Sequence, residues 1–275
     1  GSWTSGNSMT IIITGNGRRT AEAFDKTDSS PAQLIIEYCD NEICDNDIDD
    51  DGDGYPDSFD PDCPTYNPFV CDKTMYQSFT PDNGSNYFLD EINIDPVSFT
   101  NIYNLTTNGM TSTGFNALAF NPVDRFLYGF NSSSTSNNEF YRINNAGDVQ
   151  YIGDITGLSG TNDAGCMAAD GTYYVGGSGG GLYEVNTTTL VATQVVNLGF
   201  AFGDMAINPA DGLLYMWNSD ANQLYSVDPA TGTATAIGIA NTQYGAFGTL
   251  FFNEQGEIIA YGDDQNISST GQETL

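Results

Sequence analysis

Short runs of β-branched and aromatic residues alternate with polar turns over most of the chain. The runs at 140–143 (FYRI), 182–185 (LYEV) and 224–227 (LYSV) each lead through a polar turn into another run. Runs of this length that are bounded by turn residues predict β-strands paired as hairpins. We therefore expect an all-β fold.

An internal repeat organises these hairpins. The segment NPVDRFLY at 121–128 is matched by NPADGLLY at 208–215, and more loosely by ADGTYY at 169–174 and NEQGEI at 253–258. The turns recur at about 41 to 46 residues, and a repeat of ~40 to 45 residues with four short strands is typical of a β-propeller blade. The repeat therefore predicts a β-propeller over residues 72–275.

The phase of the repeat bears on the number of blades. The region opens with a half unit at 87–103, continues through three whole units and closes with a half unit at 249–261. Pairing the two halves would give four blades. However, residues 272–275 stand where a third strand should begin, which favours a chain that stops inside a longer propeller. We expect four or more blades here and about six or seven in the parent protein.

Residues 1–38 have a different pattern. Two apolar runs, at 9–14 and 32–38, are separated by a Gly15-Asn16-Gly17 turn. Two or three strands cannot bury a core by themselves, so we interpret this region as the C-terminal strands of a β-sandwich whose earlier strands are missing. The region resembles the closing strands of sandwich modules in large bacterial surface proteins, through Trp3, Gly6, Asn7, residues 11–13, Gly15, Gly17, Arg18, Ala21, Asp25, Pro31, Leu34 and Tyr38.

Composition excludes several classes of function. The chain has 36 acidic and 6 basic residues and a formal net charge of −30, which would repel nucleic acid and anionic membrane surfaces. It contains no histidine, so histidine-based catalytic triads and histidine-bound zinc sites are excluded. No run approaches the ~20 apolar residues that span a bilayer, which predicts no direct membrane insertion. The first residues lack the features of a signal peptide, so we expect the export signal outside this segment.

Four of the five cysteines surround an acidic stretch, which sets off residues 39–71 as a linker. Cys39, Cys44, Cys63 and Cys71 predict two disulfides, and the isolated Cys166 predicts a buried thiol. We favour the nested pairs Cys44–Cys63 and Cys39–Cys71, although sequence alone allows three pairings. A zinc site is the alternative, but nearby carboxylates suit a harder cation.

Residues 49–60 (DDDGDGYPDSFD) fit a calcium-binding loop. Calcium takes six to eight oxygen ligands, so its loops carry carboxylates at alternate positions and a glycine at the sharp turn. With Asp49 at position one, Gly54 stands at position six. The predicted ligands are Asp49, Asp51, Asp53, the Tyr55 carbonyl, Asp57 (directly or through water) and Asp60.

The alternative is a solvated acidic linker. Eleven acidic residues and no basic one lie between Asp40 and Asp62, and such crowding is costly without a cation. We therefore favour calcium. A second ion could use Asp45, Asp47, Asp50 or Asp62.

The loop and the Asp60-Pro61-Asp62-Cys63-Pro64 segment resemble thrombospondin type 3 repeats, and residues 39–63 look like linkers of secreted Bacteroidota proteins. The resemblance implies calcium binding and export to the surface of a Bacteroidota-like bacterium, as an adhesin or a component of a surface fibre. No flanking helices are evident, so a helix-loop-helix sensor that opens on calcium is not implied.

Other candidate sites are interpreted as structural. Carboxylates near predicted strand ends could act in acid–base pairs, but in propellers such residues more often cap turns. The glycine-rich segment at 176–181 lacks the lysine and helix of a phosphate-binding loop and predicts a strand-to-strand loop. Recurring aromatic residues could stack on sugars, but the repeat predicts them as core between blades. The carboxylates are Asp163, Asp204, Asp220, Asp263 and Asp264; the aromatics are Tyr128, Tyr173, Tyr174, Tyr215 and Trp217.

These patterns favour a non-enzymatic, calcium-stabilised segment of a large secreted cell-surface protein, acting in adhesion, surface display or fibre assembly. Its expected partners are neighbouring domains of the same parent, surface glycans or other surface proteins. The alternatives are a glycan-binding propeller and a propeller hydrolase or lyase acting on polysaccharide. The linker is expected to stiffen the joint between sandwich and propeller.

Overall fold

The computed structural model describes residues 42–71, 74–81, 86–94, 96–111, 114–131, 138–241, 244–253, 255–264 and 273–274. The predicted sandwich strands at 1–38 and the predicted disulfide residue Cys39 lie outside these ranges. Residues 42–275 form one compact unit, distinct from residues 1–41. The acidic linker therefore packs in the same unit as the strands that follow it.

The described residues form five antiparallel sheets and one short 3-10 helix, η1 (Asp57–Phe59). The first sheet contains β1 (Met75–Phe79), β2 (Phe88–Ile94) and β3 (Val97–Asn104). Three four-stranded sheets follow: β4 (Phe115–Phe120), β5 (Leu127–Asn131), β6 (Glu139–Ile143) and β7 (Val149–Asp154); β8 (Ala164–Met167), β9 (Tyr173–Gly176), β10 (Gly181–Asn186) and β11 (Val191–Asn197); β12 (Met205–Ile207), β13 (Leu214–Asn218), β14 (Gln223–Asp228) and β15 (Thr233–Ile237). The last sheet contains β16 (Tyr244–Phe252), β17 (Ile258–Asp264) and β18 (Glu273–Thr274).

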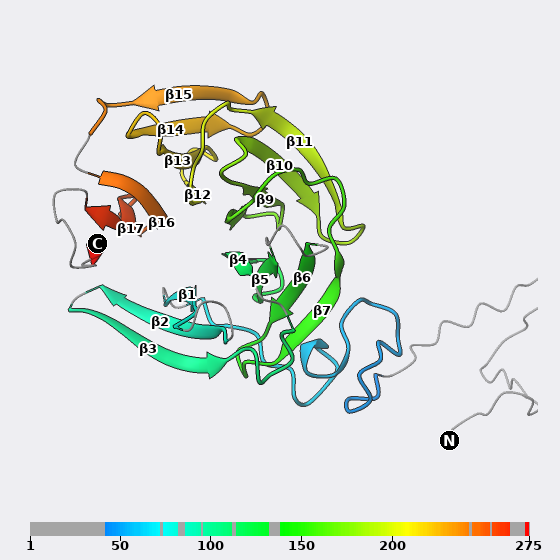
Figure 1. Ribbon diagram of the computed structural model, residues 1–275. Coiled ribbons are helices and arrows are strands. Elements are labelled where there is room, and N and C mark those ends of the chain that lie inside the picture. The colour runs from blue at the N-terminus through cyan, green and yellow to red at the C-terminus, as the bar shows by residue number, and fades with distance from the viewer. Residues whose placement is uncertain are drawn as a thin grey trace, which may run out of the picture. The chain divides into compact units, whose positions relative to one another are not determined.

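The sheets follow one another around a common centre, with β4, β8 and β12 on the inside and β7, β11 and β15 on the outside (Figure 1). Inner strands of successive sheets contact each other, from β4 to β8, β12 and β16. This arrangement is a β-propeller, so the predicted all-β propeller of four or more blades is confirmed. The first and last sheets are separate and do not merge into one blade. The strand expected near residue 272 is β18, whereas β1 was not predicted.

The sequence repeat produces the same turn in successive blades. Between β12 and β13, the side-chain Oδ1 of Asn208 accepts the N–H of Ala210 at 2.9 Å, and the carboxylate of Asp211 accepts the N–H of Leu213 at 2.9 Å. Between β4 and β5, Asn121 and Asp124 make the same two bonds, to residues 123 and 126. These side chains satisfy N–H groups that the strands leave unpaired, which fixes each hairpin.

The fourth turn residue adopts a left-handed conformation in both turns. Gly212 has φ 72° and suits this conformation, because glycine has no Cβ. Arg125 takes the same place with φ 65°. A non-glycine residue is strained there, so the β4–β5 turn needs support that the β12–β13 turn does not.

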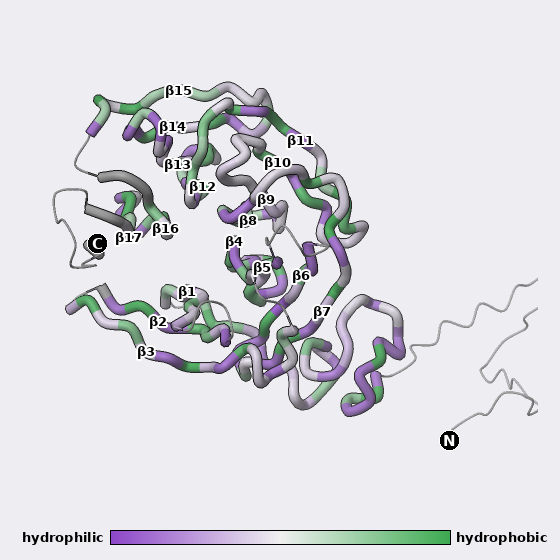
Figure 2. The backbone as a smooth tube through the Cα atoms, viewed as in Figure 1, coloured by the Kyte–Doolittle hydropathy of each residue, from purple (hydrophilic) through white to green (hydrophobic). Residues whose placement is uncertain are grey.

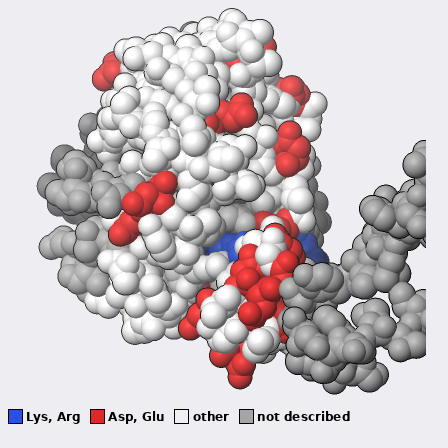
Figure 3. Space-filling model, turned by 90° about the vertical axis from the view of Figure 1, so that its right-hand side faces the viewer, with Lys and Arg blue, Asp and Glu red and all other residues white. Residues whose placement is uncertain are grey.

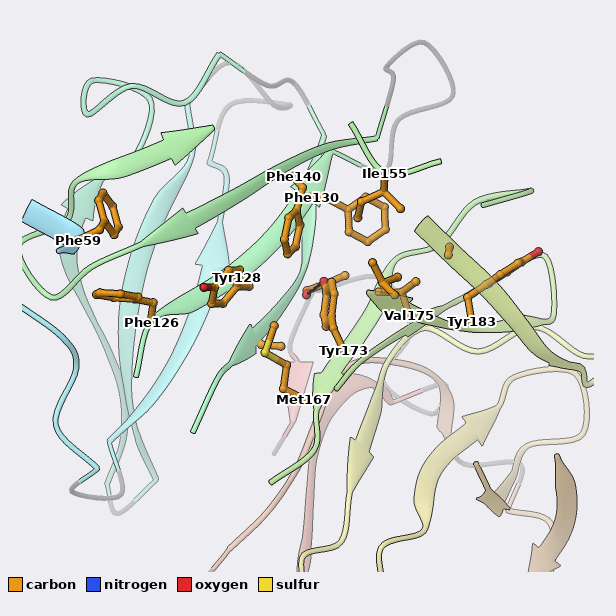
Figure 4. Packing of buried hydrophobic residues seen from close by; sticks show 14 residues of the cluster. Phe59, Phe126, Tyr128, Phe130, Phe140, Ile155, Met167, Tyr173, Val175 and Tyr183 are labelled. Carbon is orange, nitrogen blue, oxygen red and sulfur yellow. Dashed lines mark hydrogen bonds between the residues drawn. The ribbon is translucent and has the colours of Figure 1, made fainter. Parts of the chain in front are cut away.

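Alternating burial along the strands builds the core, and Figure 2 shows hydrophobic and hydrophilic residues alternating along them. Between the sheets β4–β7 and β8–β11, the ring of Phe140 lies 5.4 Å from that of Tyr128 and 5.6 Å from that of Tyr173 (Figure 4). Full burial of each such side chain contributes roughly 1.5–3 kcal/mol. Phe59 of the linker belongs to the same cluster, so the core extends from the blades into the acidic segment.

Candidate metal centre

The acidic loop folds through hydrogen bonds from its own backbone to its aspartates. Asp49 accepts the N–H of Gly52 at 2.7 Å through Oδ1 and the N–H of Gly54 at 2.9 Å through Oδ2. Asp53 accepts the N–H of Tyr55 at 2.9 Å. Closely spaced aspartates therefore turn the chain over residues 49–55 without a helix or strand. Glu42 spans the two ends of this turn, accepting the N–H of Asp50 at 2.8 Å and the N–H of Asp57 at 3.0 Å.

A disulfide closes the loop. Cys44 and Cys63 are bonded, with their Cα atoms 5.6 Å apart, as the nested pairing predicted. Cys166 is a buried free thiol, which confirms that prediction. Cys71 is an exposed free thiol, and its predicted partner Cys39 lies outside the described residues. A disulfide between two loop ends fits an oxidising, extracellular environment.

The loop is packed against the turns of the β4–β7 blade. The ring of Phe59 lies 5.2 Å from that of Phe126, which is fully buried. The hydroxyl of Ser58 donates to Asp148 at 2.9 Å, and the backbone N–H of Phe69 donates to the carbonyl of Arg125 at 2.8 Å. This last bond supports the strained Arg125 turn. The loop is therefore a fixed part of the blade.

Three carboxylates converge at the end of the loop. One ligand atom from each of Asp51, Asp53 and Asp60 lies within 4.8 Å of the others, and Asp51 also belongs to a second such group with Glu42 and Asp49. Figure 3 shows acidic side chains gathered in one patch on a face that is otherwise mostly neutral. A compact group of carboxylates suits a hard divalent cation.

Asp60 is the most unusual member of the first group. Its side chain is only 1% exposed, yet its Oδ2 has no hydrogen-bond partner among the described residues. Its Oδ1 accepts the backbone N–H of Asp62. A buried carboxylate oxygen without a donor is costly, because the charge has lost its hydration and gained nothing in return. A cation bound to Oδ2 would remove that cost.

The electrostatics of the loop also favour a bound cation. Burial, and then the charges of Asp53, Asp51 and Glu42, raise the pKa of Asp60 above its ordinary value. Burial and the charges of Asp51 and Asp49 likewise raise the pKa of Asp53, although Arg142 and the bond from Tyr55 oppose this. The carboxylates therefore repel one another as they stand.

The predicted ligand set is only partly brought together. Asp49, Asp51, Asp53 and Asp60 fall in the two carboxylate groups. Asp57 does not, because its two oxygens accept the backbone N–H groups of Asn46 at 2.9 Å and Asp47 at 2.8 Å. Asp57 thus caps a neighbouring turn.

Glu42 was missed because it lies seven residues before the twelve-residue pattern. Its place beside Cys44 was the available signal, since the disulfide brings that end back to the loop. The four residues predicted for a second ion lie outside the two carboxylate groups; they are Asp45, Asp47, Asp50 and Asp62.

The remaining candidates have structural surroundings. The carboxylate of Asp220 accepts the N–H of Ala201 at 3.2 Å, and that of Asp204 accepts the N–H of Leu250 at 2.6 Å. Tyr128, Tyr173 and Tyr174 are buried, as the core interpretation predicted, while Tyr215 and Trp217 are half-buried. Residues 177–180 connect β9 to β10, which confirms the predicted strand-to-strand loop. The side chains of Asp263 and Asp264 lie outside the described set.

The fold thus defines a β-propeller protein whose first four-stranded blade carries an acidic, disulfide-closed loop. Residues 87–268 match the family described as "Repeat of unknown function (DUF6923)", and the chain belongs to that family. No curated protein matches the chain. No helix among the described residues is long and apolar enough to cross a membrane.

Solved structures resemble the chain in fold. A chain of the nidogen/laminin complex has a TM-score of 0.51 at 14% identity, with 70% of each chain covered. A structural genomics protein of unknown function from Bacteroides thetaiotaomicron VPI-5482 has a TM-score of 0.48 at 16% identity, over 72% of this chain and 54% of that one. This chain therefore spans about half the length of the Bacteroides protein. Virginiamycin B lyase from Staphylococcus aureus has a TM-score of 0.44 at 12% identity, over 76% of this chain and 71% of the lyase.

Proposed function

We propose that this chain is a non-enzymatic, calcium-stabilised segment of a large secreted cell-surface protein that acts in adhesion, surface display or fibre assembly. The observation that carries the calcium site is the buried Oδ2 of Asp60, which has no donor among the described residues. The ion would be held by the carboxylates of Asp51, Asp53 and Asp60, and the backbone carbonyl of Tyr55 would supply a further oxygen ligand.

The donor set favours calcium over zinc. Every atom in the two carboxylate groups is an oxygen, and the chain has no histidine. Cys44 and Cys63 are joined to each other, so neither offers the thiolate that a structural zinc site uses. Oxygen ligands at flexible distances are what calcium prefers.

The disulfide and the charge favour a place outside the cell. Disulfides persist in oxidising compartments, where calcium modules bind with Kd values of roughly 10⁻⁴–10⁻³ M. A net charge of −30 favours a soluble surface that does not adhere to anionic membranes. Together with the resemblance of residues 39–63 to linkers of secreted Bacteroidota proteins, this supports a surface role beside further domains of the same parent. Surface glycans or other surface proteins are the external partners that this role implies.

Isothermal titration of the full chain with calcium tests the site. We expect saturable binding, with magnesium binding more weakly because it demands a more rigid octahedron. Asp60→Asn should lower calcium affinity by about 100-fold or more, since it removes a buried anionic ligand. Asp211→Asn is the matched control, because Asp211 lies in a blade turn far along the sequence and should leave affinity unchanged. Binding that is equal in wild type and Asp60→Asn would contradict the site.

Limited proteolysis tests the structural role. Chelation should increase cleavage within residues 49–60, because the crowded carboxylates then repel one another. Equal cleavage with and without chelator would count against a stabilising ion. Turnover on a panel of polysaccharides would separately overturn the non-enzymatic assignment.

A further inference from the structure

Arg142 of β6 is buried beneath the acidic loop. Its side chain is 4% exposed, and the guanidinium Nη2 donates to the carbonyl of Gly54 at 2.6 Å. The Nε group donates to the side-chain oxygen of Gln150 on β7, which fixes the plane of the guanidinium. The blade therefore holds a charged group in one orientation against the backbone of the loop.

The same guanidinium lies over the ring of Tyr55. Its central carbon is 4.2 Å from the centre of that ring and 5.0 Å from the centre of the Phe59 ring. Contacts of this kind are worth roughly 0.5–2 kcal/mol, with the larger values where water is excluded. Arg142 thus contacts the loop at Gly54, at Tyr55 and beside η1.

A second blade residue fixes the other end of Tyr55. Its hydroxyl donates to Asp124 at 3.3 Å, and the same carboxylate oxygen accepts the hydroxyl of Tyr128 at 2.5 Å. Gly54 and Tyr55 are therefore held from the blade at the carbonyl, the ring face and the hydroxyl.

Gly54 and Tyr55 occupy the critical part of the loop. They stand at positions six and seven, where calcium-binding loops turn sharply and supply a backbone carbonyl as a ligand. Gly54 has φ 99°, a conformation that L side chains rarely adopt. The backbone N–H of Tyr55 is bonded to Asp53, so displacement of this peptide would also displace one of the converging carboxylates.

We propose that Arg142 is a positioning residue for the metal centre, holding the Gly54–Tyr55 peptide in the conformation that binds the ion. The inference rests on the proposed calcium site and deepens it. Partners that orient metal ligands from outside the ligand set typically change affinity by about 10- to 100-fold when they are removed. The propeller blade thereby becomes part of the calcium site.

Positioning and simple electrostatics predict opposite signs. Arg142 is a positive charge close enough to Asp53 to lower its pKa, so by charge alone its removal should tighten cation binding. If Arg142 positions the loop, its removal should weaken binding despite the lost repulsion. The sign of the change in affinity therefore separates the two explanations.

The test is isothermal titration of the full chain with calcium, comparing wild type with Arg142→Gln and Arg142→Lys. We expect both variants to bind calcium about tenfold or more weakly, because neither a glutamine nor an ammonium reproduces the planar stack with its fixed donors. Arg125→Gln is the matched control, since it removes the same charge from an exposed position on the same blade. It should change affinity by less than about twofold, as expected for a solvent-screened charge.

The outcomes separate this inference from the calcium site itself. Unchanged or tighter binding in Arg142→Gln, with Arg142→Lys equal to wild type, would overturn the positioning role and leave the site intact. Absence of calcium binding in wild type would overturn the site instead. If neither Arg142 variant folds by circular dichroism, Tyr55→Leu provides a milder change, because it removes the ring that the Arg142 guanidinium contacts. It should weaken binding by about threefold or more, and unchanged affinity would overturn the inference.

Discussion

The acidic loop at residues 49–60 and the blade turn at residues 208–215 are both built on aspartates that accept backbone N–H groups. In the blade turn both carboxylate oxygens of Asp211 have donors. Its Oδ1 accepts the N–H of Leu213, and its Oδ2 accepts the hydroxyl of Tyr215 at 2.8 Å. In the loop, Asp49 is similarly engaged, but Asp60 is buried with one oxygen lacking a donor among the described residues.

This difference in hydrogen bonding indicates which acidic residues can be interpreted as metal ligands. Asp211 needs nothing further, because both of its oxygens are paired and it faces solvent. Asp60 has a raised pKa, and its Oδ2 has no donor among the described residues, which is the arrangement expected of a cation ligand. The number of acidic residues in a segment therefore says less than the number of their oxygens that remain unsatisfied.

The largest expected effect tests whether the loop is part of the blade core. Phe126→Ala should lower the free energy of unfolding by about 3–5 kcal/mol, because Phe126 is fully buried against Phe59 of the loop and Tyr66 of the linker. Leu213→Ala changes the equivalent position of the other turn, where Leu213 is only half-buried, and should cost about 1 kcal/mol. Denaturant unfolding of both variants measures the contrast. Equal losses would show that the loop adds nothing to the core.

Removal of the disulfide should give the next largest effect. Cys44→Ala combined with Cys63→Ala opens a loop of sequence separation 19 and should lower the free energy of unfolding by about 3 kcal/mol. Cys71→Ala is the control, because Cys71 is an exposed free thiol. Denaturant unfolding in excess calcium should recover part of the loss in the double variant, since the ion also binds only the folded loop. No recovery would separate the disulfide from the ion site.

Asp204 differs from both Asp60 and Asp211, and it should make the stability of the protein depend on pH. Asp204 is half-buried beside the inner strands, and burial raises its pKa to about 7, although bonds from the N–H groups of Met205, Leu250 and Gly165 oppose the shift. Its ordinary value is 3.8, so between about pH 4 and pH 7 the folded state holds a proton that the unfolded state has lost. Stability should therefore fall as pH rises through this window.

The slope from this one group should be no more than about 1.4 kcal/mol per pH unit. Other acidic residues also titrate in this range, so the measurement is the difference between wild type and Asp204→Asn in denaturant unfolding from pH 4 to pH 8. The asparagine variant should show a shallower fall. Superimposable pH profiles would exclude Asp204 as the source.

The sequence repeat predicted most of the propeller, because the side chains that cap its turns recur from blade to blade. Asn121 and Asn208 cap the same turn with the same bonds, and that chemistry is visible in the letters NPVD and NPAD. The predicted β18 follows from the same phase. β1 escaped prediction because the sequence at residues 75–79 does not match the repeat, although β1 pairs with β2 as β5 pairs with β6.

The candidate metal centre was only partly predictable, because its geometry depends on contacts far apart in sequence. The spacing of Asp49, Asp51 and Asp53 is local and could be recognised from the pattern. Glu42 approaches the loop only after Cys44 and Cys63 join, and Asp57 turns away to cap residues 46 and 47. Arg142 lies 88 residues from Gly54, so no local pattern could associate it with the loop.

The smallest expected effect returns to the two aspartates with which the comparison began. In chelator at pH 7, Asp60→Asn should be as stable as wild type or more stable, because it replaces a buried charge, whose pKa is raised, with a neutral group of similar shape. Asp211→Asn should instead lose about 1 kcal/mol, since its amide group no longer accepts both the Leu213 N–H and the Tyr215 hydroxyl.

In excess calcium Asp211→Asn should become more stable than Asp60→Asn, because only wild type and Asp211→Asn gain the binding energy of the ion. Denaturant midpoints for the three proteins in both conditions measure this crossing. A loss of more than about 1 kcal/mol for Asp60→Asn in chelator would mean that its Oδ2 is already satisfied, and that the loop is a blade turn like the other.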